Sequence, residues 1–168
     1  RLLGGLVPVA PGAAPDGAQY EDPHRAYSRA MLLEDQGASF VVLGAEVLRA
    51  GKPLLTAEEQ TRRVIPVLKK LRGEIGIPVA VATTRAETAQ RALEMGAEII
   101  YDQSAASFEP QIAKTAADAS GVLILGHMRG TPERWAKQAP VPDPIATVLA
   151  DLDAGVHRAR MAHLLNTQ

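Results

Sequence analysis

Three residues of this sequence have side chains that can transfer protons, and two arginines follow them closely. Glu46, Asp102 and His127 each come at or just after a short apolar run, where a general acid or base could be held in place. Arg49 and Arg129 are spaced so that a guanidinium could bind an anionic group beside them. Proton transfer next to a bound anion is the chemistry that this set of residue types indicates.

Each of these residues also has a purely structural interpretation, and the sequence leaves both open. Glu46 could pair with an arginine, and Asp102 could cap the turn or helix that follows it. His127 could be a hydrogen-bonded structural histidine, and residues 129–132 could form a turn into the next helix.

Metal and nucleotide sites are not indicated. The chain has no cysteine, and its four histidines do not cluster in the sequence. No glycine-rich fingerprint follows a strand candidate, and no Gly-Lys-Ser/Thr motif is present. We therefore expect no bound metal and no cofactor.

The composition excludes several other classes of protein. With 18 Lys+Arg against 19 Asp+Glu and only 4% aromatic residues, nothing favours nucleic acid or an anionic membrane surface. No apolar run approaches the roughly 20 residues that a membrane helix needs. A chain of 168 residues is expected to form one domain, residues 1–168, and the lack of cysteine suits the cytoplasm.

Short apolar runs alternate with helical patterns along the whole chain. Strands are predicted over residues 2–9, 40–43, 78–81, 98–101 and 122–125, all buried on both faces. This order predicts an α/β fold of about five (βα) units with parallel strands. Two architectures remain open, an open doubly wound sheet and an incomplete (βα)8 barrel. In both, ligands bind at the carboxyl ends of the strands.

Local signals place the helix ends. Asp22 before Pro23 is a predicted N-cap. Thr56 and Thr84 are each followed three residues later by glutamate, which is capping-box spacing. The last helix is predicted over residues 144–165.

Taken in order, the segments after the strand candidates resemble those of dihydropteroate synthase, the pterin-binding (βα)8 enzyme of folate biosynthesis. The resemblance covers nearly all of the chain. It is most specific at His127-Met128-Arg129-Gly130-Thr131-Pro132, which matches the motif of the family's fifth strand. The family-matching candidates for substrate binding are Glu46, Arg49, Thr83, Asp102, His127 and Arg129.

Other positions depart from the family pattern. The third-strand Asp and fourth-strand Asn, which hydrogen-bond the pterin in the family, are Ala82 and Tyr101 here. Each lost partner leaves a polar group of the ligand unpaired, at about 1–3 kcal/mol. The remaining departures are in the first loop, the second loop and the residue before the fifth-strand His: Pro8, Gly12, Leu48 and Gly126.

The resemblance therefore implies two functions, and a third, a pterin- or folate-binding domain of the related methyltransferase type, is disfavoured by the same substitutions. The first is a homologue with a degraded active site that acts as a binding or interaction protein, with weak affinity for a pterin or a p-aminobenzoate-like ligand. The alternative is an active synthase known through an incomplete chain, which would then use Mg²⁺. Because the family's last three strands have no counterpart here, we expect one of three states: an open sheet whose gap the fifth helix covers, self-association, or completion by another chain.

Overall fold

The computed structural model describes residues 2–9 and 17–164 of the chain. The elements, in chain order, are β1 (Gly4–Pro8), η1 (Gly17–Glu21), α1 (Pro23–Asp35), β2 (Phe40–Gly44), α2 (Ala57–Leu71), β3 (Val79–Ala82), α3 (Ala86–Glu94), β4 (Ile99–Asp102), α4 (Gln111–Asp118), β5 (Val122–Leu125), η2 (Pro132–Lys137) and α5 (Pro144–Met161), where η marks a 3₁₀ helix. All five predicted strands are present.

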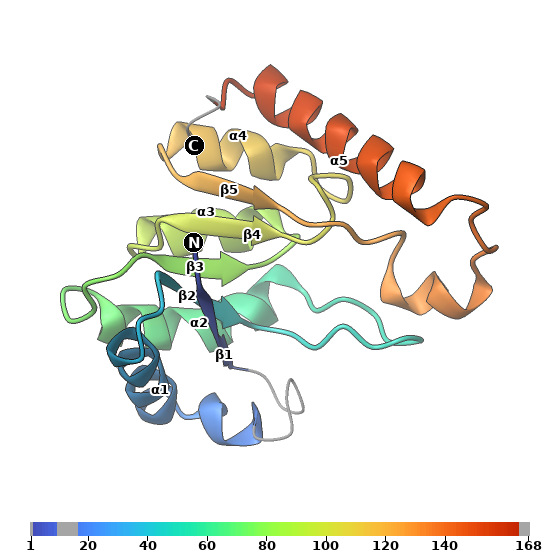
Figure 1. Cartoon of the computed structure of the whole chain (residues 1–168). Coiled ribbons are helices and arrows are strands. Elements are labelled where there is room, and N and C mark those ends of the chain that lie inside the picture. Colours follow the sequence, from blue (N-terminus) through green and yellow to red (C-terminus); the bar gives the residue numbers. More distant parts are fainter. Residues whose placement is uncertain (1, 10–16, 165–168) are drawn as a thin grey trace.

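The strands form one parallel sheet whose spatial order, β1-β2-β3-β4-β5, is the order of the chain (Figure 1). A doubly wound sheet would reverse its order at a switch point, whereas a (βα)8 barrel adds its strands one after another. The order therefore selects the barrel type of the two predicted architectures. The sheet is not closed, so the described fold is a partial barrel.

One face of the sheet packs against the helices. The strand register places Val7, Leu43, Val81, Ile100 and Leu123 in a single row across all five strands. All five are buried in the hydrophobic core. The core also takes in the inward stripe of α2, which runs through Val64, Val67, Leu68 and Leu71. Burial of this row against α1–α4 holds the strand ends in place.

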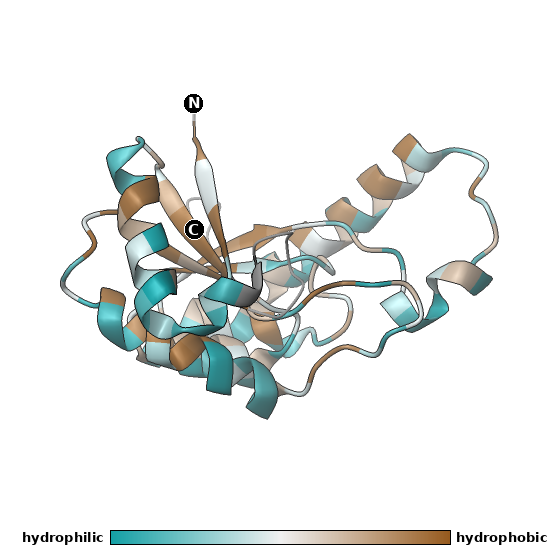
Figure 2. Ribbon diagram, turned by 90° about the horizontal axis from the view of Figure 1, so that it is seen from below, coloured by the Kyte–Doolittle hydropathy of each residue, from teal (hydrophilic) through white to brown (hydrophobic). Residues whose placement is uncertain are grey.

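The opposite face is only partly covered. Leu6 and Val122, at the two ends of the next row, are 54% and 37% exposed. The prediction that every strand is buried on both faces is therefore wrong for the edge strands, because an unclosed sheet leaves its inner face open. Helix α5 packs beside α4 and β5 and leaves both of these residues exposed. Figure 2 shows hydrophobic bands along α5 as well.

The predicted helix ends are confirmed at two of three positions. Asp22 caps α1 by accepting from the His24 N–H at 3.0 Å, and Thr56 caps α2 by accepting from the Glu59 N–H at 3.2 Å. Thr84 does not cap α3: its hydroxyl has no hydrogen-bond partner among the described residues, and the start of the helix is bound by the Glu109 carboxylate, which accepts from the Ala86 N–H at 2.7 Å.

The last helix begins at Pro144 as predicted but ends at Met161, four residues before the predicted end. No helix of the described ranges has the length and hydropathy needed to cross a membrane.

Candidate functional site

The carboxyl-terminal edge of the sheet, called the mouth below, brings three of the departures from the family pattern, Pro8, Ala82 and Tyr101, into one row. Pro8, Gly44, Ala82, Tyr101 and Ile124 are register partners on neighbouring strands, so their side chains share the inner face. We call these five residues the mouth row. None of them carries a carboxylate or an amide. Gly12 lies outside the described residues.

Thr83 and Asp102 come one residue after members of the mouth row, so they point to the opposite, helix-covered face. Both are buried, Asp102 completely. The Asp102 carboxylate accepts from the N–H and hydroxyl of Ser104, both at 2.8 Å, and from the Ala106 N–H at 2.7 Å. Its structural interpretation as a cap of the following turn is thereby confirmed.

The turn that Asp102 holds also anchors α5. Ala105 and Ala106 have positive φ of 54° and 56°, a conformation that alanine rarely adopts. The Arg158 guanidinium of α5 donates to the Ala105 carbonyl at 2.9 and 3.3 Å. Burial raises the pKa of Asp102, against the opposing effects of its hydrogen bonds with Ser104 and Ala106 and of the Arg158 charge.

Glu46 belongs to a second polar network. Its Oε1 accepts from Gln60 Nε2 and its Oε2 from the Leu55 N–H, both at 2.8 Å. Gln60 Oε1 in turn accepts from the Thr83 hydroxyl at 2.6 Å. No arginine forms an ion pair with Glu46 in the described structure. Burial raises the pKa of Glu46, and the Leu55 N–H and the more distant charges of Arg85 and Arg63 only oppose this.

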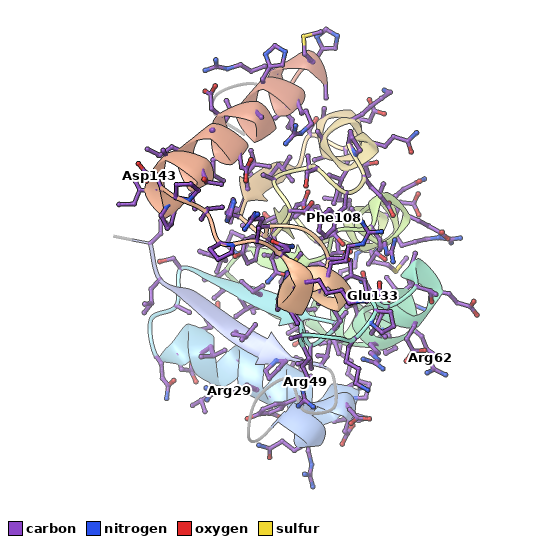
Figure 3. The ribbon with its side chains drawn as sticks, turned by 90° about the vertical axis from the view of Figure 1, so that its right-hand side faces the viewer. Arg29, Arg49, Arg62, Phe108, Glu133 and Asp143 are labelled. Atoms are coloured by element: carbon purple, nitrogen blue, oxygen red, sulfur yellow. The ribbon has the colours of Figure 1, made fainter. Side chains whose placement is uncertain are left out.

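A pocket of about 610 Å³ opens at the mouth beside β4 and β5. It is lined by Leu48 of the β2–α2 segment, by Tyr101 and Gln103 at the end of β4, and by residues that follow β5: His127, Met128, Arg129, Trp135, Gln138, Ala139, Pro140 and Val141. Figure 3 looks onto this edge of the sheet, with η2 in front and Arg49 and Glu133 labelled. The pocket thus joins polar side chains to an apolar and aromatic wall.

The polar groups of this pocket are held by hydrogen bonds. His127 Nε2 lies 2.8 Å from Asp151 Oδ2 of α5. Arg129 Nη1 donates to the Ala139 carbonyl at 2.7 Å, and Gln138 Nε2 donates to the Arg129 carbonyl. These bonds connect the two ends of residues 129–139 with each other and His127 with α5.

Five of the six predicted site residues therefore separate into three groups. His127 and Arg129 line the pocket. Glu46 and Thr83 share the Gln60 network, and Asp102 holds the turn after β4. Arg49 is exposed and is not among the residues that line the pocket.

Sequence reasoning missed several residues of these groups, among them Gln60, Gln103, Trp135 and Asp151. Gln60 has a recognisable signal, since it is a polar residue on the buried stripe of α2. Trp135 is the only tryptophan of the chain. Within residues 2–9 and 17–164, no group of three or more His, Asp or Glu residues could hold a metal ion.

Comparison with known proteins places the chain in a family. The model of the family described as "Pterin binding enzyme" matches residues 4–167. The dihydropteroate synthase of Synechocystis is 32% identical over 164 residues, which are 98% of this chain and 57% of that protein. The dihydropteroate synthase of Mycobacterium leprae is 35% identical over 156 residues, 92% of this chain and 55% of that protein. The chain thus spans little more than half the length of these relatives.

Solved structures agree with the fold. The dihydropteroate synthase of Yersinia pestis, solved with a sulfonamide drug, superposes with a TM-score of 0.89 at 23% identity over 98% of this chain and 59% of that one. The Xanthomonas albilineans dihydropteroate synthase with 4-aminobenzoic acid gives 0.81 at 29% identity over 96% and 56%. With the family model matching from the first strand to beyond the last helix, this chain belongs to the pterin-binding enzyme family, among the relatives of dihydropteroate synthase.

Proposed function

We propose that this chain supplies the first five (βα) units of a dihydropteroate synthase, which joins a dihydropterin pyrophosphate to p-aminobenzoate and releases pyrophosphate. The observation that carries the proposal is the pocket at the mouth, where (βα) enzymes bind their ligands. Relatives solved with pteroic acid and with 4-aminobenzoic acid support this class of ligand.

Two residues of the pocket have chemical roles in this proposal. The amine of p-aminobenzoate attacks the pterin CH2, the bond to the pyrophosphate oxygen breaks, and the amine loses a proton. Arg129 places a guanidinium where negative charge develops on the leaving group. In the tautomer that donates from Nε2 to Asp151, His127 presents Nδ1 as the base for the amine proton.

Mg²⁺ is assigned no step. The Glu46 and Asp102 carboxylates accept hydrogen bonds from the protein, and the described residues offer no three-ligand cluster to hold the ion.

A second candidate, ligand binding without turnover, is favoured by the mouth row. A pterin ring donates hydrogen bonds from its amino and ring N–H groups, and Ala82 cannot accept them. Tyr101 offers a single hydroxyl in place of an amide. Two unpaired polar groups, at about 1–3 kcal/mol each, would weaken pterin binding by two to four orders of magnitude.

One assay separates the two candidates. The chain and the full-length product of its gene are incubated with dihydropterin pyrophosphate and p-aminobenzoate, and dihydropteroate is followed by mass spectrometry. Product formation supports the synthase. No product from either protein, together with calorimetric binding of pteroic acid, supports binding alone. In that case the double variant Ala82→Asp/Tyr101→Asn should bind 6-hydroxymethylpterin at least tenfold more tightly than the wild type.

The open sheet supports a further proposal about partners. We propose that a second copy or a completing chain covers the inner face, because Leu6 and Val122 are exposed there on the edge strands β1 and β5. Light scattering tests the second copy: a monomer at micromolar concentration, unchanged by Leu6→Glu, would contradict self-association and leave the completing chain.

A further inference from the structure

The segment between β2 and α2 has no regular secondary structure from residue 45 to residue 56, yet it forms part of the pocket wall through Leu48. An irregular segment needs specific contacts to keep one conformation, since it has no hydrogen-bond ladder of its own. The contacts that hold this segment lie at its base and at its tip.

At the base, both backbone groups of Leu55 are bound by side chains. Its N–H donates to Glu46 Oε2 at 2.8 Å, and its carbonyl accepts from Arg85 Nε at 3.1 Å. Glu46 is also fixed from the other side, because Oε1 accepts from Gln60 Nε2 of α2 at 2.8 Å. The Glu46 carboxylate therefore joins the two ends of the segment, at residues 46 and 55, and ties both to α2.

At the tip, the segment contacts the other wall of the pocket. Lys52 N–H donates to the Arg49 carbonyl at 3.0 Å, which closes a turn around Gly51. The Gly51 N–H then donates to the Pro132 carbonyl at 2.9 Å. Pro132 begins η2, which carries Trp135 to the pocket. One hydrogen bond thus connects the segment to residues 127–141.

We infer that Glu46 is a positioning residue for the pocket: by closing the base of residues 46–55 it holds Leu48 in the wall and keeps Gly51 on Pro132. Both carboxylate oxygens are bound by the protein, and Glu46 is not among the residues that line the pocket. It acts through the segment and not on a ligand. The inference depends on the proposed function only in treating this pocket as the ligand site.

The test compares Glu46→Ala and Glu46→Gln with Glu58→Ala, a control that removes an exposed glutamate from the first turn of α2. Amide exchange of Gly51 and Leu55 is measured by NMR, with the emission of Trp135, the only tryptophan, as a second readout. Calorimetry with pteroic acid reports the pocket. Glu46→Gln keeps one acceptor oxygen, so we expect it to have an intermediate effect. It also keeps the test decisive if Glu46→Ala fails to fold.

The inference predicts that Glu46→Ala accelerates exchange of the Gly51 amide at least tenfold, although Glu46 does not touch Gly51. It also predicts a red shift of Trp135 emission and at least tenfold weaker pteroic acid binding, with Glu58→Ala unchanged. A purely local role would accelerate Leu55 alone, and that result would overturn the inference.

The two proposals can fail separately. If neither the wild-type chain nor the full-length product of its gene binds pteroic acid, the proposed function fails, while the exchange at Gly51 still decides the role of Glu46.

Discussion

The Thr83 hydroxyl donates to Gln60 Oε1 at 2.6 Å, whereas the neighbouring Thr84 hydroxyl, equally buried at 2% exposure, has no hydrogen-bond partner among the described residues. The Thr83 oxygen also accepts from the Arg85 N–H at 3.0 Å. Two adjacent buried threonines thus differ in whether their hydroxyl groups are satisfied, which allows a matched pair of substitutions.

We expect Thr83→Val to lower the free energy of unfolding by about 1–3 kcal/mol, because it leaves Gln60 Oε1 buried without its donor. Thr84→Val should be neutral or stabilising, since it replaces an unsatisfied buried hydroxyl with a methyl. Urea denaturation of both variants measures this. Equal losses in the two variants would show that packing of the γ-methyl, and not the hydrogen bond, explains the effect.

Glu46 should make stability depend on pH in a particular direction. Its pKa is raised in the folded chain above the ordinary value near 4.5, so the folded state binds the proton more tightly than the unfolded state. Protonation of Glu46 therefore contributes fully to the free energy of unfolding below about pH 4.5. This contribution falls as the pH rises through the folded pKa and no longer changes above it. Asp102 titrates with the same sign but is present in both proteins compared below.

The unfolding free energies of wild type and Glu46→Gln are to be compared from pH 4 to pH 8. The unfolding free energy of the wild type, relative to that of Glu46→Gln, should fall as the pH rises above 4.5 and then become constant. Glu58→Gln is the control, and its difference from wild type should not vary in this way. A Glu46→Gln difference that is constant over the whole range would contradict the raised pKa.

Gly155 is the one buried residue of α5, and its lack of a side chain is a requirement of packing. A Cβ there would lie 2.8 Å from the Ala105 carbonyl oxygen and 2.9 Å from the Ala105 Cβ. Gly→Ala inside a helix ordinarily stabilises by about 0.5–1 kcal/mol. Here we expect a net loss of about 1–2 kcal/mol, since overpacking costs about 1–3.

Ala154→Gly, on the exposed side of the same helix, should lose about 1 kcal/mol by helix propensity alone. Thermal unfolding with hydrogen exchange of α5 distinguishes the two causes. Gly155→Ala should also loosen the contact of α5 with Ala105, and a stabilised Gly155→Ala variant would exclude the close approach.

Tyr101 and Gly126 occupy complementary space at the mouth. A Cβ on Gly126 would lie 3.0 Å from Tyr101 Cε2 and 3.0 Å from the Gln103 Cα. We expect Gly126→Ala to lose about 1–3 kcal/mol of stability. In the background of Tyr101→Ala the same change should lose about 0.5–2 kcal/mol less, because only the backbone contact remains. A double-mutant cycle with no coupling would show that the tyrosine ring does not limit this position.

The fold could be predicted because its signals are local. Short apolar runs, proline at the start of α1 and α5, and polar caps each depend on a few neighbouring residues. Thr84 is the exception: it does not cap α3, and the start of that helix is bound instead by Glu109, which accepts from the Ala86 N–H across 23 positions. The strand sequences themselves did not show which strands would be exposed, since exposure depends on whether the sheet closes; an open inner face was expected only from the missing strands of the family barrel.

The site was predicted less well because residue type does not reveal which face of the sheet a side chain occupies. Ala82 and Tyr101 face the mouth, while Thr83 and Asp102, one position later, face the helices. A shift of one residue therefore decides between contact with a ligand and burial in the core. Only the strand register shows which face of the sheet each of these side chains occupies. Asp151, which binds His127 across 24 positions, could not be inferred from spacing at all.

Because every strand pairs with the strand before it in the chain, the molecule can be assembled by successive addition. Each new unit finds its docking edge already formed, and α1 to α4 also contact one another in sequence. Such a polypeptide can acquire native structure while it is still emerging from the ribosome, one repeat at a time. An internal lesion, for example in β3, should then leave the portion made earlier able to fold and block the portion made later.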